Sequence, residues 1–141
     1  MKTDGFWLYA FSPTASDGDC PRSGKWMLFT SATQHNAVWN TIRDATEAGT
    51  LGCGAKTAIP VPDANPLYAN SGYLLTCIYT YDFDDQKDVR RVLTGLRQLG
   101  FTHRLSYKSD ADTLSGTYGP GSAMYVSQPN SLDFEDRRVT R

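Results

Sequence analysis

The sequence has few of the residues on which metal centres and disulfide frameworks depend. It contains three cysteines, Cys20, Cys53 and Cys77, and two histidines, His35 and His103. An odd number of cysteines, without a CxxC pair or a Cys/His cluster, argues against a disulfide framework and against a structural zinc site. We therefore expect no metal, no cofactor and a reducing, cytoplasmic compartment.

An excess of charge of one sign is also missing. Fourteen Lys and Arg against fifteen Asp and Glu give a formal net charge of -1 at pH 7, too little positive charge to hold a long nucleic acid non-specifically. Any anion must therefore be bound by a local cluster of basic side chains. No apolar segment reaches transmembrane length, and the apolar run at the N-terminus is too short for a signal peptide, so we expect no membrane association.

The chain does have the length and the apolar content for one buried core. Its 141 residues are 40% hydrophobic, which suits a single soluble domain. We expect that domain to span residues 1–127 and to be followed by a polar, flexible tail over residues 128–141. Eight tyrosines and three tryptophans are enough aromatic residues to serve a binding surface as well as a core.

Hydrophobic periodicity predicts strands and helices in an alternating order. Apolar and β-favouring runs predict strands at residues 5–11, 25–30, 52–59, 73–82, 103–108 and 123–127. Helical periodicity predicts helices over residues 31–49 and 84–100. This order indicates an α+β fold, namely a single curved, mostly antiparallel β-sheet with two amphipathic helices packed on one face. The other face would then be open to a ligand.

The first helix has recognisable boundary signals and carries one of the histidines. Ser31 and Gln34 have the spacing of a capping box, and Gly49 is a natural helix stop. His35 falls in the first turns of this helix, where we expect it to be exposed. His103 begins a predicted strand and is expected at the surface.

Three lysines on predicted strands are the main candidates for an anion site. Lys25, Lys56 and Lys108 each lie in or at the end of a strand, where lysine is disfavoured. In one interpretation each lysine points to solvent from a half-exposed face. In the other, the three converge on the open face of the sheet and bind phosphate as point charges. The glycine-rich segment around Lys56 does not match a phosphate loop, because Ala55 separates Lys56 from the glycine that should precede it.

Tyrosine side chains provide a possible surface for a base. In the strand predicted at residues 73–82, alternation places Tyr79 on the same face as Tyr73 and Tyr81. Aromatic rings of this kind stack on nucleobases, at about 1–3 kcal/mol per base. Arg90 and Arg91 are adjacent on the second helix, about 100° apart, so at most one of them is expected to point toward the sheet edge.

Four segments together resemble one protein family. They are GKWMLF (24–29), GTLGCGAKT (49–57), CIYTYDFDDQKDVRRVLTGLR (77–97) and YKSDADTLSGTY (107–118). In this order they resemble the basophilic leukaemia-expressed protein family, whose small bacterial and viral members are often labelled phosphothreonine lyase domain proteins. The resemblance implies a fold similar to that of the cap-binding translation initiation factor 4E. It also implies a concave face that binds a nucleotide-like ligand between aromatic and basic residues.

The resemblance also implies a set of site residues. The lysines would hold phosphate, while Trp26, Tyr79 and Tyr107 would stack on or wall the base. Asp110 and Thr113 would bond the edges of the ligand or shape the loop. The residues carried over from the motifs are Lys25, Trp26, Lys56, Tyr79, Thr80, Asp82, Arg90, Arg91, Tyr107, Lys108, Asp110 and Thr113.

These residues support one main functional hypothesis and two alternatives. The main hypothesis is a protein that binds a nucleotide-derived or phosphorylated small molecule, which a bacterial or viral member of this size would use to sequester a cyclic-nucleotide signal. The first alternative is a metal-independent phosphodiesterase or a phosphothreonine-lyase-like enzyme, with Lys56 or Lys108 as the base and Tyr79 or His103 as the acid. The second is a protein interaction module without a small ligand. A homo-oligomer is compatible with all three.

Overall fold

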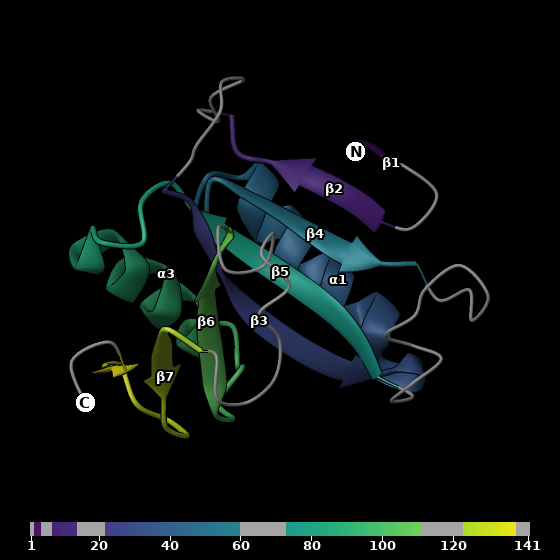
Figure 1. The fold of residues 1–141 in the computed structure, drawn as a ribbon. Coiled ribbons are helices and arrows are strands. Elements are labelled where there is room, and N and C mark those ends of the chain that lie inside the picture. The colour runs from purple at the N-terminus through teal and green to yellow at the C-terminus, as the bar shows by residue number, and fades with distance from the viewer. Residues whose placement is uncertain (1, 4–6, 14–21, 60–72, 111–122, 138–141) are drawn as a thin grey trace. The chain divides into compact units, whose positions relative to one another are not determined.

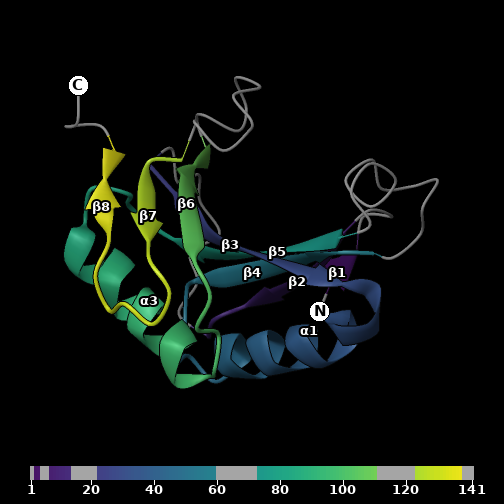
Figure 2. The same cartoon turned by 90° about the horizontal axis from the view of Figure 1, so that it is seen from below.

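The computed structural model describes residues 2–3, 7–13, 22–59, 73–110 and 123–137. Most of its elements are labelled in Figure 1, and the last strand is labelled in Figure 2. In chain order they are β1 (Lys2–Thr3), β2 (Trp7–Phe11), β3 (Gly24–Ser31), α1 (Ala32–Glu47), β4 (Gly54–Ala58), β5 (Tyr73–Thr80), α3 (Gln86–Gln98), β6 (Leu105–Ser109), β7 (Tyr125–Ser127) and β8 (Glu135–Asp136).

The strands hydrogen-bond in the order β1-β2-β4-β5-β3-β6-β7-β8. The pairs β1–β2, β2–β4, β3–β6, β6–β7 and β7–β8 are all antiparallel. A mostly antiparallel sheet with two amphipathic helices confirms the predicted α+β class. Among the residues that the structure describes, no helix is long and apolar enough to cross a membrane.

The chain divides into two compact units, to which β3 and β5 each contribute residues. The first unit takes its described residues from Met1–Ala15 and Leu28–Ile78. The second takes its described residues from Ser16–Met27 and Tyr79–Arg141. Among the residues that the structure describes, each unit contains one helix, and that helix covers strands of the same unit.

In the first unit, α1 packs against β2 and β4 (Figure 2). Ser31 is the N-cap residue, as predicted, but its hydroxyl contacts Thr33 Oγ1 and makes no cap hydrogen bond to the helix backbone. The helix ends at Glu47, and Gly49 adopts a positive φ of 78°. Glycine adopts this left-handed conformation without a steric penalty, which explains why the helix stops there.

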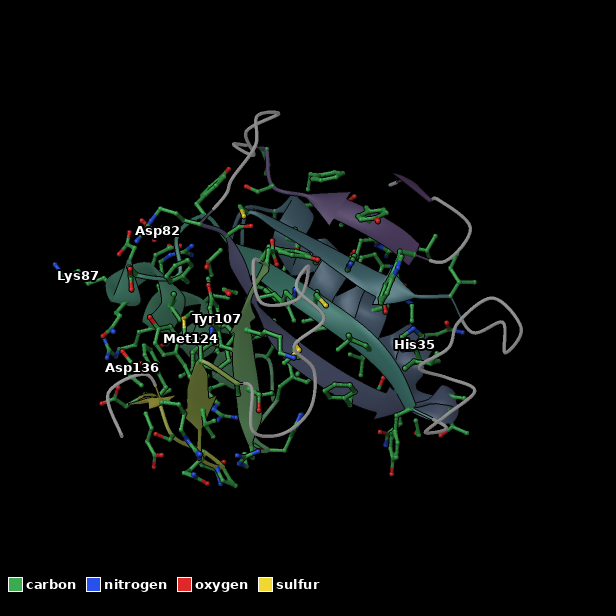
Figure 3. All side chains as sticks on the ribbon, viewed as in Figure 1. His35, Asp82, Lys87, Tyr107, Met124 and Asp136 are labelled. Atoms are coloured by element: carbon green, nitrogen blue, oxygen red, sulfur yellow. The ribbon has the colours of Figure 1, made fainter. Side chains whose placement is uncertain are left out.

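His35 is buried, so the expectation that it is exposed was wrong. It is 2% exposed and lies in α1 on the side that faces β4 (Figure 3). Its Nε2 lies 2.8 Å from the carbonyl oxygen of Ala58 and 3.0 Å from Thr57 Oγ1, and its Nδ1 lies 3.2 Å from Thr30 Oγ1. Burial lowers the pKa of the imidazole below its ordinary value of 6.5. The buried face of α1 begins one turn earlier than the apolar pattern suggested, because hydrogen bonds satisfy a polar residue there.

In the second unit, α3 buries its predicted apolar stripe except for Leu99, which follows the helix and is 39% exposed. Val89, Val92, Leu93 and Leu96 are fully buried. The side chain of Asp85 caps the N-terminus by accepting a hydrogen bond from the backbone N–H of Asp88. Such a cap satisfies one of the unpaired donors of the first turn.

The segment that follows β7 is packed against the second unit as far as Arg137. Strand β8 pairs with β7, although both β8 residues lie in the stretch we expected to be a flexible tail. The ring of Phe134 contacts Tyr125 and Trp26 at centroid distances of 4.5 and 5.9 Å. The polar composition of residues 128–141 gave no sign of this packing, because a single aromatic residue and a two-residue strand provide it.

Candidate ligand-binding site

Two of the three predicted lysines stand directly opposite each other in the second unit. In the antiparallel β3–β6 pair, Lys25 lies opposite Lys108. Directly opposed residues project from the same face of a sheet. Their side chains are nevertheless buried, at 5% and 3% relative exposure. Buried lysines are rare in proteins, so a buried, opposed pair requires an explanation.

A carboxylate and a hydroxyl lie beside Lys25. Asp110 Oδ1 accepts a hydrogen bond from Lys25 Nζ at 2.9 Å, and Asp110 Oδ2 accepts one from Ser23 Oγ. The backbone N–H of Asp110 also donates to the carbonyl oxygen of Ser23, at 2.9 Å. Lys25 Nζ lies 6.0 Å from the centroid of the Tyr79 ring, within the range of a cation–π interaction. We call Ser23, Lys25, Tyr79, Lys108 and Asp110 the lysine cluster.

Trp26 and Tyr107 belong to the core, which corrects their predicted role as walls for a base. They lie opposite each other in the same β3–β6 pair, one position along from the lysines, and each is 0% exposed. Their rings meet edge to face at 5.3 Å, and Trp26 Nε1 donates to the carbonyl oxygen of Val89. Successive strand residues point to opposite faces, so these rings turn toward α3 while the lysines turn away from it.

Thr80 and Gly24 fit closely around the buried Tyr107 ring. Thr80 is 0% exposed, and its Oγ1 hydrogen-bonds the Tyr107 hydroxyl. A Cβ atom at Gly24 would lie 2.6 Å from the Tyr107 ring, so only glycine fits at that position. Burial raises the pKa of the Tyr107 phenol far above its ordinary value of 10.0. Thr80 and Tyr107 therefore act as packing residues of this unit.

Arg90 and Arg91 lie on the surface of α3 and make local ion pairs. Arg90 pairs with Asp133 at 2.9 Å and lies over the Phe134 ring, whereas Arg91 pairs with Asp88 at 2.8 Å. Both arginine side chains are more than 40% exposed.

Asp82 is also engaged at the surface. Its Oδ1 accepts a hydrogen bond from Arg22 Nε at 3.1 Å, and the same guanidinium bonds Asp84. His103 is exposed just before β6, where partial desolvation and the charge of Arg97 lower its pKa. The ion pairs of Arg22 are thus partly exposed, whereas Lys25 and Lys108 are buried.

Lys56 belongs to the first unit, where it contacts an aromatic residue. It lies opposite Tyr9 in the β2–β4 pair, and its Nζ is 4.2 Å from the centroid of the Trp7 ring. Thr113 lies outside the described residues. Ser23 was not among the predicted site residues, because only the β3–β6 register brings it opposite Asp110.

Comparisons with known proteins agree with the fold and identify a family. The family model described as basophilic leukemia-expressed protein Bles03 matches residues 12–114. A comparison with curated proteins gives no match. The match confirms the resemblance that the sequence motifs indicated.

Two solved structures illustrate the likeness of fold. C. elegans eIF4E-3, in complex with the 4E-binding protein Mextli and a cap analog, has 17% identity and a TM-score of 0.55, with 77% of this chain and 65% of that chain covered. Schistosome eIF4E complexed with m7GpppA and 4E-BP has 16% identity and a TM-score of 0.60, with 89% and 72% covered. This chain thus spans just under two thirds of the length of the first structure. The likeness confirms the predicted initiation-factor-4E-like fold.

Proposed function

This chain belongs to the family of the basophilic leukemia-expressed protein Bles03, and on that basis we propose that it binds a nucleotide-derived or otherwise phosphorylated small molecule. The observation that carries the proposal is the buried, directly opposed pair Lys25 and Lys108. The likeness to eIF4E structures that contain a cap analog or m7GpppA supports the same class of ligand. The proposed phosphate site is the lysine cluster of the second unit.

Electrostatics favours an anion at this pair. Like charges directly opposed across a ladder repel, and burial of an ammonium group costs free energy unless a counter-charge accompanies it. Asp110 supplies one negative charge to Lys25. A phosphate group carries up to two negative charges and several acceptor oxygens, so it can accept hydrogen bonds from both ammonium groups at once.

The neighbouring groups suit the rest of a nucleotide-like ligand. The Tyr79 ring adjoins Lys25 on the face where the lysines lie, and a base that stacks on it would sit beside a bound phosphate. Ser23 Oγ is a further hydrogen-bonding group at the same place. A cyclic di- or trinucleotide contains both bases and phosphates, so we propose a cyclic-nucleotide signal as the ligand to test first.

Thermal denaturation with a ligand panel tests the proposal. The panel contains cyclic di- and trinucleotides, m7GpppA and inorganic pyrophosphate. A ligand present at 100 times its Kd should stabilise the protein by about 2.7 kcal/mol, which raises Tm by roughly 5–10 °C in a chain of this size. If no member of the panel shifts Tm, the proposal is wrong.

The variant Lys108→Met tests whether the lysine pair provides the binding. Methionine keeps much of the apolar stem of lysine but removes its charge, so the variant should remain folded and lose the Tm shift. Lys87→Met is the matched control, because Lys87 is exposed on α3 and points away from the strands (Figure 3). A normal shift with Lys108→Met would assign the ligand to another site.

The same incubation separates binding from the enzymatic alternative. Chromatography of the recovered nucleotide should show intact ligand if the protein only binds it. New products that are absent with Lys108→Met would instead indicate a phosphodiesterase or a lyase, with Lys108 as the base.

A further inference from the structure

The first unit carries a row of aromatic side chains on the side of β2 that faces away from α1. In the β2–β4 pair, Thr57 lies opposite Leu8 and hydrogen-bonds His35 of α1. The side chains of Thr57 and Leu8 therefore project toward the helix. Trp7, Tyr9 and Phe11 occupy the alternate positions of β2 and therefore project from the other face. We call these three residues the aromatic row.

The row is accessible and its rings are aligned. Phe11 is 49% exposed, and Trp7 and Tyr9 are partly exposed. The ring planes of Tyr9 and Phe11 lie within 4° of parallel, with centroids 6.4 Å apart. Opposite Phe11 stands Gly54, and a Cβ atom there would touch the Phe11 ring at 3.6 Å. Because residue 54 is a glycine, no side chain of β4 takes up the space beside the Phe11 ring at this position.

A cation completes the arrangement. Lys56 lies opposite Tyr9 on the same face, and its Nζ stands 4.2 Å from the centroid of the Trp7 ring. Parallel rings suit a flat aromatic ligand, whereas a lysine beside them suits a ligand that carries negative charge. Nucleobases attached to phosphate combine both properties, and single-strand-binding proteins use aromatic side chains with nearby cations in this way.

We propose that the aromatic row, together with Lys56, is a second ligand site that binds a nucleobase. The base stacks on the parallel rings of Tyr9 and Phe11, and Lys56 holds the attached phosphate. The ligand is either a mononucleotide or a base of a short single strand, because both present the same flat ring and the same charge. This site lies wholly within the first unit and does not depend on the lysine cluster of the second.

Nucleosides provide the sharpest test, because they contain the base and lack the phosphate. Isothermal titration of the full chain with adenosine and guanosine should show binding that falls by about tenfold in both Phe11→Ala and Tyr9→Ala. Tyr9→Phe retains the ring and should bind as the wild type does. Phe29→Ala is the matched control, since Phe29 is 51% exposed on β3, from which β4 and β5 separate the row.

Two further arms identify the source of the base and the role of Lys56. Lys56→Gln should weaken binding of nucleoside 5′-monophosphates by about tenfold and leave nucleoside binding nearly unchanged. A hexanucleotide that binds more tightly than a mononucleotide, and equally loses affinity in Phe11→Ala, would assign the site to single strands. The proposal is overturned if neither nucleosides nor the hexanucleotide bind, or if Phe11→Ala and Tyr9→Ala leave binding intact. Titration of the Lys108→Met variant with pyrophosphate reports separately on the lysine cluster, so each of the two proposed sites can be rejected independently of the other.

Discussion

At the scale of single residues, Asp110 sets the charge of the lysine cluster. Its carboxylate accepts hydrogen bonds from both Lys25 and Ser23. In that position it acts as an internal counter-ion for a buried ammonium group. A bound phosphate would need the same donor, so Asp110 and the ligand should compete for Lys25.

We predict that Asp110→Asn binds inorganic pyrophosphate about tenfold more tightly than the wild type does. The substitution removes a negative charge beside the proposed phosphate and keeps a similar side-chain shape, and tenfold corresponds to about 1.4 kcal/mol. Isothermal titration measures the change. Asp133→Asn, which alters a carboxylate paired with Arg90 at the surface, is the control and should have no effect. Weaker binding by Asp110→Asn would mean that the carboxylate itself holds the ligand or shapes its site.

At the scale of elements, His35 fixes the N-terminal turns of α1 to the sheet. The imidazole contacts Thr30 at the end of β3 and both Thr57 and Ala58 in β4. Thr57 in turn hydrogen-bonds Thr76 of β5 at 2.7 Å. A buried polar network of this kind orients the helix on the strands as long as the imidazole remains neutral.

We predict that the free energy of unfolding falls as the pH drops below about 6.5, and that His35→Gln reduces this dependence. The folded-state pKa of His35 is lowered by burial, so the unfolded state binds the proton first and acid destabilises the native state. The loss begins near the unfolded value, is at most about 1.4 kcal/mol for each pH unit, and ends below the folded-state pKa. Urea denaturation between pH 7.5 and 5 measures it.

His103 requires a parallel measurement, because its pKa is lowered as well. His103→Gln should retain most of the pH dependence, since His103 is exposed whereas His35 is 2% exposed. If His35→Gln has the same pH profile as the wild type, the imidazole of His35 does not resist protonation in the folded protein.

At the scale of the whole molecule, each unit has its own core and its own candidate site. Aromatic packing among Trp26, Tyr107, Tyr125 and Phe134 forms the centre of the second unit. The buried Arg97 joins two segments of this unit, residues 101–103 and 127–131. Its guanidinium donates to the hydroxyl of Ser127 and to the carbonyl oxygens of Phe101, His103, Gln128 and Ser131.

We predict that Arg97→Met destabilises the protein by about 3 kcal/mol or more. Methionine fills part of the space but removes a hydrogen-bond donor from carbonyl oxygens in two separate stretches of chain, residues 101–103 and 128–131, and the loss of donors to such acceptors is costly. Urea denaturation measures the loss. Arg91→Met is the matched control on the same helix; its ion pair with Asp88 is exposed, so a change of less than about 0.5 kcal/mol is expected. An equally small loss for Arg97→Met would show that water replaces the guanidinium.

Local pattern was sufficient to predict most elements and to single out the strand lysines as candidate site residues. The apolar stripe of α3 and the β-favouring run of β5 are signals that neighbouring residues carry by themselves. Lysine in a strand is a similar local signal, and it identified Lys25 and Lys108 before any pairing was known. Trp26 and Tyr107 were misassigned although a local signal was present, because alternation along β3 places Trp26 and Lys25 on opposite faces of the strand.

The amino-acid sequence by itself determined the class of fold, the family and the residue types available for binding, because periodicity and motifs are properties of short stretches of chain. Only the tertiary structure decided which of those residues meet. The β3–β6 register brings Lys25 opposite Lys108 and Ser23 opposite Asp110, although more than eighty positions separate them in the chain. The packing of α1 buries a histidine that its position made look exposed. Register and packing depend on contacts between distant segments, and no local pattern contains that information.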